Sequence, residues 1–576
     1  CGAKLVLPCC GESVIVLFWR ASCHVLRVVN NEKMSTREII TVQLGNYANF
    51  VGAHVWNLQQ TCFSYNRNDS RIPLEFNHDI FFREGKSPRG QVTYTPRLVV
   101  ADLPGSLGHL KNDLYDPPPS AKEQISWSGK VTIHKTEPVP KSSSSHSRDQ
   151  SSRSFSSDED KDICRADLTS VGGASEIPPP DNLARHWTDF LKVDFHPKTV
   201  NLVHGYHHNS RDDPFDLYGQ GVQCYEDSAW QEGFLDSLRW FAEDSDSLQA
   251  FSVVLDAHDG FSGLAGGLLE HLGDDYPSKA TLCWPLFQPH YRALKEGAAA
   301  TERAHRCFNA VMCYGSLSRL SSGFCPLSVS ADHFKGTART FQHLRLLDQE
   351  QYQTSAVLGS ALDSFYCGLK LKNQPLDLTQ LLGQLTGVGR RMASLSCSFP
   401  LGLPENGLLE NHSCIPVPLT PGAVADARQD ISLAVVRGCP QDLISRLPRS
   451  VQDPGEVVHR FADKMCGGGL AWLMRVENPT RTANGFPAIF DEAVTPRGLI
   501  SKHPREKNTG VALVPSLVCV QSGSGTARGL QEVVHAGSSL DLQRFHRCTL
   551  AGTEPDAFKE ALNAVQELAS DYDLGL

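Results

Sequence analysis

The sequence lacks the motifs by which cysteine-rich proteins bind metals or form disulfide frameworks. Its 18 cysteines are scattered from Cys1 to Cys548, and no two of them form a C-x-x-C pair. Such pairs and regular spacings are the usual signs of a structural zinc site or of a secreted disulfide-bonded domain. We therefore expect reduced, mostly buried thiols in an intracellular protein.

Positive charge is also scarce. The 54 lysines and arginines are outnumbered by 64 aspartates and glutamates, which gives a formal net charge of −10. No block of basic residues stands out to neutralise phosphates, which argues against nucleic acid as the main partner.

No transmembrane segment is predicted either. The apolar run VIVLFW near the N-terminus ends at Arg20 and is too short to span a bilayer. Peripheral membrane association stays open. The segment itself, residues 1–33, precedes Met34 and the first strand pattern, so we interpret it as translated upstream sequence. The alternative is a targeting segment, because it carries Lys4, Arg20 and Arg27 with few acids.

Three histidines lie close together, at His204, His207 and His208. On a helix they could share one face, as metal ligands do. Gly205 interrupts the group and an aspartate-rich stretch follows it, so the pattern favours a solvent-facing turn and no metal site.

Short strand patterns alternate with helical ones along the chain, which predicts a layered α/β fold with a mostly parallel sheet. Three segments share one design: Ile39–Val42, the strand within Arg97–Leu107, and Phe251–Leu255 each run into a turn that contains glycine. The first and third turns lead into helices. Such turns lie at the carboxyl ends of strands, where open α/β sheets bind ligands. At Gly45 the following helix N-terminus could hold an anion.

A composition break interrupts this pattern. Residues Lys141–Asp160 contain one aromatic and no aliphatic side chain, so they cannot bury enough surface to offset their ordering entropy. Proline runs at 117–119 and 178–180 flank them. We predict a disordered, serine-rich insertion around 117–180 within a domain of residues 34–400.

Residues 401–576 are predicted to form a C-terminal α+β domain. AWLMRVENP and ALVPSLVCVQSGSG are strand-like. Glu554–Tyr572 is an amphipathic helix whose apolar side, expected to face the core, carries Phe558, Leu562, Val565 and Leu568.

The three strand-and-turn segments carry a family resemblance. REIITVQLGNYANFVGAHVW resembles the opening strand, first phosphate loop and first helix of tubulins. YTPRLVVADLPGSL is similar to the tubulin segment in which a Tyr-x-Pro-Arg strand is followed by an Asp-x-Glu-Pro-Gly turn, and SLQAFSVVLDAHDGFSGLAGGLLEHLGDDYP resembles the tubulin strand, glycine-rich signature loop and helix. With DAHDGFSG in place of the glycine signature, the match is close to the misato family, tubulin-like proteins associated with mitochondrial distribution and morphology. The resemblance covers Met34 to about Leu401 and implies a tubulin/FtsZ-like layered fold.

Carried over residue by residue, the resemblance implies degenerate nucleotide loops at Gly45, Asn46, Asn49, Asp102, Gly260, Ser262 and Gly263. Asp259 brings a carboxylate to where phosphate oxygens would lie, and so does Asp216 in the third loop. Phe261 replaces a threonine hydroxyl, and Tyr47 would crowd a base pocket. The turn after Asp102 lacks the glutamate that helps to place magnesium in tubulins. Independently of nucleotide, we expect Ser262 to cap the following helix.

The stretch that completes hydrolysis in a tubulin filament falls on NQPLDLTQ. Asp377 matches the family, but Gln380 lies where a hydrolytic glutamate would be, and glutamine is no general base at neutral pH. We therefore expect no enzyme, no catalytic residue, no metal and no bound cofactor. GTP stays an open alternative at Gly45 and Asn46.

The resemblance then implies a non-hydrolytic scaffold that regulates mitochondrial distribution, morphology and fusion through protein contacts. Its expected partners are proteins of the mitochondrial outer membrane or the cytoskeleton, and its expected location is the cytoplasm and that membrane. The alternative function is a GTP-binding protein that assembles or modulates filaments of the cytoskeleton or spindle.

Overall fold

The computed structural model describes residues 4–7, 15–18, 37–63, 75–86, 90, 92–108, 110, 184–289, 296–329, 341–387, 390–405, 416–423, 431–439, 454–466, 469–482, 485–506, 509–550 and 552–573. Of the first 33 residues it describes two short antiparallel strands, β1 (Lys4–Leu7) and β2 (Ile15–Phe18). Met34 and the insertion predicted around 117–180 lie outside these ranges.

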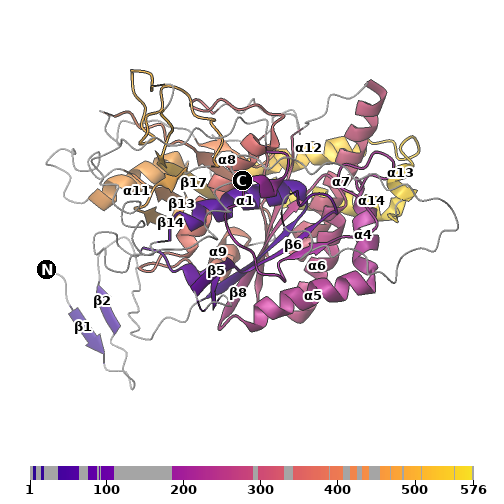
Figure 1. The fold of residues 1–576 in the computed structure, drawn as a ribbon, viewed down its shortest axis with the longest axis horizontal. Helices are drawn as coiled ribbons and strands as arrows, with labels where there is room; N and C mark the ends of the chain where they lie inside the picture. Colours follow the sequence, from indigo (N-terminus) through magenta and orange to yellow (C-terminus); the bar gives the residue numbers. More distant parts are fainter. Residues whose placement is uncertain are drawn as a thin grey trace.

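A parallel sheet of six strands forms the centre of the N-terminal part (Figure 1). Its order is β10-β9-β8-β3-β6-β7, and each neighbouring pair is parallel. The predicted layered α/β architecture is thus confirmed. The strands are β3 (Glu38–Leu44), β6 (Leu98–Asp102), β7 (Val200–Leu202), β8 (Leu248–Asp256), β9 (Ala280–Leu286) and β10 (Gly323–Phe324).

Both faces of this sheet are buried, which explains why its strands are apolar almost throughout. Alternate residues point to opposite faces, so Ile39 and Ile40 belong to two different cores. Helices α1 (Asn46–Gln60) and α8 (Gln351–Leu369) pack on each other over the first core. The second core is covered by α4 (Tyr218–Glu226), α5 (Ser228–Glu243), α6 (Phe261–Asp275) and α7 (Glu296–Leu320).

A second sheet has the order β12-β11-β17-β13-β14 and is antiparallel except between β13 and β14. Its strands are β11 (Ser394–Ser398), β12 (Val417–Pro418), β13 (Ile431–Arg437), β14 (Leu470–Val476) and β17 (Ser516–Ser522). Helix α8 contacts β13, β14 and β17, and every residue from Tyr352 to Leu369 is buried. The first core therefore continues from one sheet to the other, and α11 (Pro454–Met465) covers the far face.

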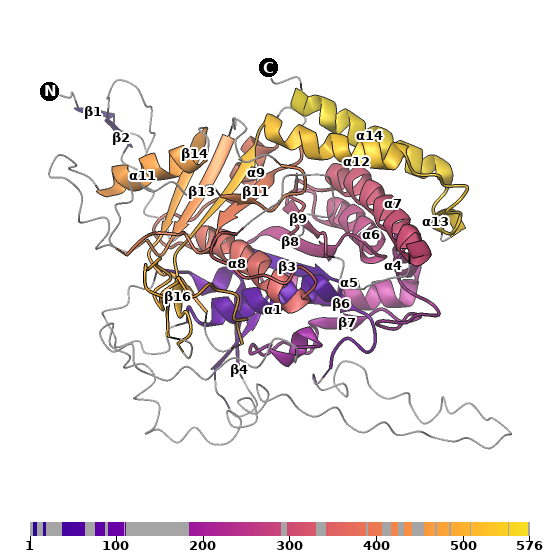
Figure 2. The same ribbon diagram turned by 90° about the horizontal axis from the view of Figure 1, so that it is seen from above.

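The last helices return to the N-terminal part. Figure 2 shows α12 (Ala527–Ser538) and α14 (Pro555–Asp573) side by side along α7. As predicted, Phe558, Val565 and Leu568 of α14 are buried, and Leu562 packs against the same core.

The remaining elements are short. They are β4 (Phe82–Lys86) paired with β5 (Val92–Pro96), β15 (Thr480–Arg481) paired with β16 (Leu513–Val514), α9 (Leu378–Leu385), α13 (Arg547–Leu550) and three 3-10 turns. In the described ranges, no helix is both long and apolar enough to cross a membrane. Each cysteine described, from Cys62 to Cys548, is a free thiol, and most of them are buried.

Candidate functional site

The predicted loops meet at one edge of the parallel sheet, because β3 lies between β6 and β8. The register pairs Leu44 with Ala101 on one side and with Leu255 on the other. The turns that follow these three strands are therefore neighbours, and the site residues on them contact one another.

The N-terminus of α1 is occupied by a carboxylate of the same chain. The backbone N–H groups of Tyr47 and Ala48 donate to the two carboxylate oxygens of Asp256, at 2.9 and 2.7 Å. These are unpaired first-turn donors of the kind that hold phosphate at other helix N-termini. Gly45 precedes them with a φ of 110°, and a Cβ there would lie 2.5 Å from the Asp256 carboxylate. The turn predicted to hold an anion holds Asp256.

Asp256 is almost completely buried. Burial and the neighbouring Asp259 carboxylate raise its pKa well above the ordinary value, while the N–H groups of Tyr47 and Ala48 act in the opposite direction. The sequence reasoning missed Asp256, although its place at the end of β8, just before the signature loop, was visible in LDAHDG.

Asp102, at the end of β6, is held by neutral donors. Its Oδ2 accepts from Asn49 Nδ2 at 2.7 Å and from Trp187 Nε1 at 3.0 Å, and its Oδ1 accepts from the Leu103 N–H at 2.8 Å. Complete burial raises its pKa to about 6 against these hydrogen bonds. Asn49 and Asp102, predicted together from the resemblance, are brought together, and they join α1 to β6.

Asn46 and Tyr47 face α8. Asn46 Nδ2 lies 3.4 Å from Gln351 Oε1, and the Tyr47 hydroxyl donates to Thr354 Oγ1 at 3.0 Å. Tyr47 is fully buried, which raises its pKa. Tyr47 therefore fills the space between the first turn of α1 and α8.

The glycines of the signature loop allow close helix packing. A Cβ on Gly263 would lie 1.9 Å from the carbonyl oxygen of Tyr218 in α4, and a Cβ on Gly260 would lie 2.5 Å from the ring of Phe215. Phe215 in turn packs edge-on against Phe261 at 5.1 Å. Side chains and backbone of the protein itself thus lie against both glycines.

Ser262 does not cap α6, so that prediction was wrong. The cap residue is Gly260, and Ser262 lies within the first turn, fully buried, where its Oγ donates to the Asp259 carbonyl at 2.8 Å. The side chain of Asp259 instead accepts from the N–H of Phe261 at 3.0 Å. Asp259 lies three residues before Ser262, ahead of the helix, so its carboxylate can accept from a first-turn N–H group, whereas a serine inside the helix cannot reach one.

Asp259 completes a cluster of carboxylates. Burial and the carboxylates of Asp102 and Asp216 raise its pKa to about 7, against the N–H of Phe261 and the guanidinium of Arg306. The side chain is only partly buried. Since like charges gather here, each added negative charge is unfavourable.

We expect Asp259→Asn to stabilise the protein at alkaline pH. The folded-state pKa lies above the ordinary value, so the unfolded chain loses this proton first and wild-type stability falls as pH rises from about 4 to about 7. An amide avoids that loss and can still accept from Phe261. The gain should reach about 1–2 kcal/mol above pH 7, discounted for partial exposure, and vanish near pH 4. Thermal melts at both pH values measure it, with the exposed Asp236→Asn as control. A gain that does not change with pH would contradict the assignment.

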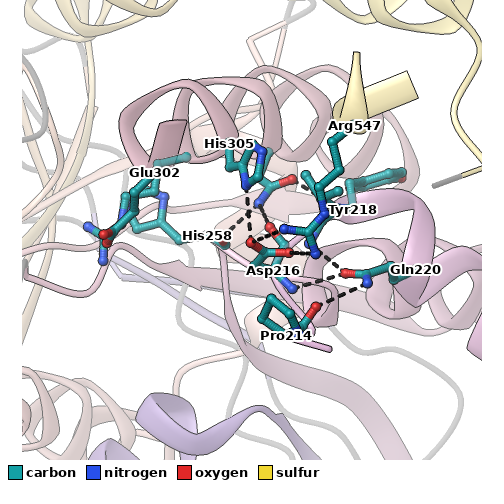
Figure 3. A network of polar contacts seen from close by, with 11 residues as sticks. Pro214, Asp216, Tyr218, Gln220, His258, Glu302, His305 and Arg547 are labelled. Carbon is teal, nitrogen blue, oxygen red and sulfur yellow. Dashed lines mark hydrogen bonds and ion pairs between the residues drawn. The ribbon is translucent and has the colours of Figure 1, made fainter. Parts of the chain in front are cut away.

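The third predicted loop contains Asp216, whose charge is balanced within the chain (Figure 3). Its carboxylate lies 3.1 Å from His305 Nδ1 of α7 and 3.1 Å from Arg547 Nη2 of α13. Asn309 of α7 donates to the carbonyls of Asp216 and His258, each at 2.7 Å, and accepts from the N–H of Tyr218 at 2.9 Å. Arg547, His305 and Asn309 were not predicted, because nothing in their local sequence marks them as partners.

Two other predicted features lie apart from this edge. Asp377 caps α9, accepting from the Gln380 N–H at 3.1 Å, and forms an ion pair with Arg37. His204 and His207 are exposed on a loop, as expected for a turn. Among the described residues, no group of three or more His, Cys, Asp or Glu side chains is arranged to hold a metal ion.

Comparison with known proteins gives two family models and several curated relatives. The model described as the Misato Segment II tubulin-like domain matches residues 37–150, and the one described as a tubulin domain matches residues 178–371. The chain is similar to protein misato homolog 1 of Homo sapiens, with 29% identity over 94% of this chain and 98% of the relative. It is 28% identical to protein misato of Drosophila melanogaster, over 93% and 98% of the two chains. Protein dml1 of Aspergillus clavatus is 30% identical over 60% of this chain and 63% of its own length.

Proposed function

Because this chain belongs to the misato family of tubulin-like proteins, we propose that it is a non-hydrolytic scaffold that regulates mitochondrial distribution, morphology and fusion through protein contacts. The mitochondrial part of this proposal, with a location in the cytoplasm and at the mitochondrial outer membrane, comes from the family resemblance. Its partners would be proteins of that membrane or of the cytoskeleton.

One observation carries the non-hydrolytic part. Asp256 accepts from the N–H groups of Tyr47 and Ala48, and so uses the donors that a nucleotide phosphate would need. A phosphate at this position would have to displace a buried carboxylate and leave that carboxylate without its donors. Losing charge-assisted hydrogen bonds costs about 1.5–3 kcal/mol each.

The surrounding charges act in the same direction. The Asp102 carboxylate acts on Asp256 and Asp259, Asp259 acts on Asp256, and burial raises the pKa of all three. A triphosphate would add several negative charges to this cluster, which is costly in a partly desolvated site. Gly260 and Gly263, which a phosphate loop would use for close approach to ligand, lie against Phe215 and Tyr218 instead.

Calorimetric titration with GTP and magnesium tests the proposal. We expect purified protein to carry no stoichiometric GTP or GDP, to hydrolyse none above background and to bind GTP no more tightly than about 100 µM, about 5.5 kcal/mol of binding free energy. A sub-micromolar dissociation constant would overturn the proposal and favour the alternative, a GTP-binding protein that assembles or modulates filaments.

Asp256→Ala is the matched variant, because it frees the two N–H groups of Tyr47 and Ala48 and removes the carboxyl group that occupies them, without changing Gly45. Its affinity for inorganic pyrophosphate should rise at least tenfold over wild type, equivalent to about 1.4 kcal/mol. Circular dichroism must show that the variant is folded. If the folded variant binds no better than wild type, Asp256 is not what excludes the anion.

A further inference from the structure

Two thiols lie beside buried cations at the far end of α1. Cys62, just past the end of α1, is half-buried; its thiol donates to the Leu58 carbonyl at 3.6 Å and lies beside the fully buried thiol of Cys367 in α8. The guanidinium Nη2 of Arg437, at the end of β13, lies 3.8 Å from Cys62 Sγ. This group, Cys62 with Cys367 and Arg437, joins three elements far apart in sequence.

More positive than negative charge is buried around the two thiols. Lys370 and Arg437 are both fully buried, and Asp363, also fully buried, forms an ion pair with Arg437. Lys370 Nζ donates to the neutral Gln59 Oε1 at 3.1 Å and lies over the ring of Phe76 at 4.7 Å. Two buried cations thus face one buried carboxylate, and an adjacent thiolate would balance the second positive charge.

We propose that Cys62 and Cys367 form a peroxide-sensitive dithiol, in which Cys62 is the reacting thiolate and Cys367 the resolving thiol. The Cys62 thiolate attacks one oxygen of hydrogen peroxide, the O–O bond breaks, and the leaving hydroxide takes up a proton to give water. Cys62 is then a sulfenic acid. Cys367 sulfur attacks the Cys62 sulfur, the S–O bond breaks, and a second water leaves with the Cys367 proton. Overall, two thiols and one peroxide give one disulfide and two waters.

The electrostatics of Cys62 support this division of roles. The hydrogen bond with Cys367 and the charges of Lys370 and Arg437 lower its pKa to about 6, against burial and the Asp363 carboxylate. His78 contacts the backbone of Cys62, and its own pKa is lowered to about 3, first by burial, so that it is neutral at physiological pH. Burial raises the pKa of Cys367.

Other thiols of the chain serve as internal controls. Cys224 is half-buried like Cys62, but burial and Asp227 raise its pKa to about 11. Cys466 and Cys519 have their sulfurs 3.4 Å apart, yet both are buried and the pKa of Cys519 is raised. Cys224 tests whether partial exposure alone makes a thiol reactive, and the Cys466/Cys519 pair tests whether closeness of two buried sulfurs alone does so.

The test uses the reduced, full-length wild-type protein treated with increasing hydrogen peroxide, alkylated with iodoacetamide and digested for mass spectrometry. We expect a Cys62–Cys367 disulfide peptide at peroxide concentrations at which Cys224, Cys466 and Cys519 stay reduced and are therefore recovered as alkylated peptides. Without peroxide, alkylation of Cys62 at pH 7 should be at least about 100-fold faster than that of Cys224, and its rate should rise with a midpoint near pH 6.

A variant separates the two chemical steps. In Cys367→Ser, peroxide should stop at the Cys62 sulfenic acid, which dimedone traps. Failure of Cys62 to react faster than Cys224, or absence of the Cys62–Cys367 peptide when other cysteines oxidise, would overturn the proposal. Neither readout depends on nucleotide or on mitochondrial partners. The test of the dithiol therefore stands or falls independently of the proposed scaffold function.

Discussion

Replacing Gly221 by alanine is expected to destabilise the protein by about 3 kcal/mol, the upper range for forcing extra volume into a packed interior. A Cβ on Gly221 would lie 1.6 Å from the carbonyl oxygen of Gly260 and 2.7 Å from the backbone nitrogen of Leu264. Both obstacles are backbone atoms at the start of α6, so α4 and α6 would have to separate. The apparent melting temperature, measured at a fixed scan rate, should drop by several degrees.

Gly273→Ala is the matched control in α6 itself. No atom lies within 4 Å of a Cβ at Gly273. Because alanine favours helix over glycine by about 0.5–1 kcal/mol, this variant should be as stable as wild type or slightly more so. Equal losses from both substitutions would mean that close packing of α4 on α6 is not what Gly221 provides.

Replacing Arg437 by methionine is expected to cost about 3–5 kcal/mol, because it leaves the Asp363 carboxylate buried and unpaired. Both side chains have no exposed surface, and Arg437 also donates from Nε to the carbonyl of Asn478 at 3.1 Å. Thermal and urea unfolding should both move in the destabilising direction.

Two further variants show whether the loss comes from the unpaired charge. Arg437→Met combined with Asp363→Leu should recover much of the stability, since a buried ion pair can be exchanged for apolar side chains at little cost. Arg345→Met removes an ion pair with Asp491 in which Arg345 is 62% exposed, and it should cost less than about 1 kcal/mol. If Arg345→Met were as harmful as Arg437→Met, burial would not explain the effect.

Local pattern was enough to predict the framework of the fold. The apolar runs before Gly45, in Arg97–Leu107 and at Phe251–Leu255 became β3, β6 and β8, and the spacing of Phe558, Val565 and Leu568 identified the buried face of α14. Hydrophobic periodicity reports which side of an element is buried, and it is a property of neighbouring residues.

The candidate site was less predictable, because its contacts are between distant residues. Asp256 reaches the start of α1 only through the register of β8 beside β3, and Arg547 meets Asp216 from 331 positions away. The glycines show a different limit. A glycine permits the close approach of a ligand or of another helix equally well, and the sequence alone does not show which of the two approaches it. At Gly263 it is the backbone of Tyr218 in α4.

The burial of α8 has a mechanical consequence. Since the whole of Tyr352–Leu369 is enclosed between the two sheets, rotation of one sheet against the other would expose apolar surface, at about 25 cal/mol for each Å². A few hundred Å² would already cost several kcal/mol, comparable with the stability of a whole domain. The two described sheets are therefore expected to behave as one stiff unit. Two partners bound to opposite ends would be held at a fixed distance and orientation.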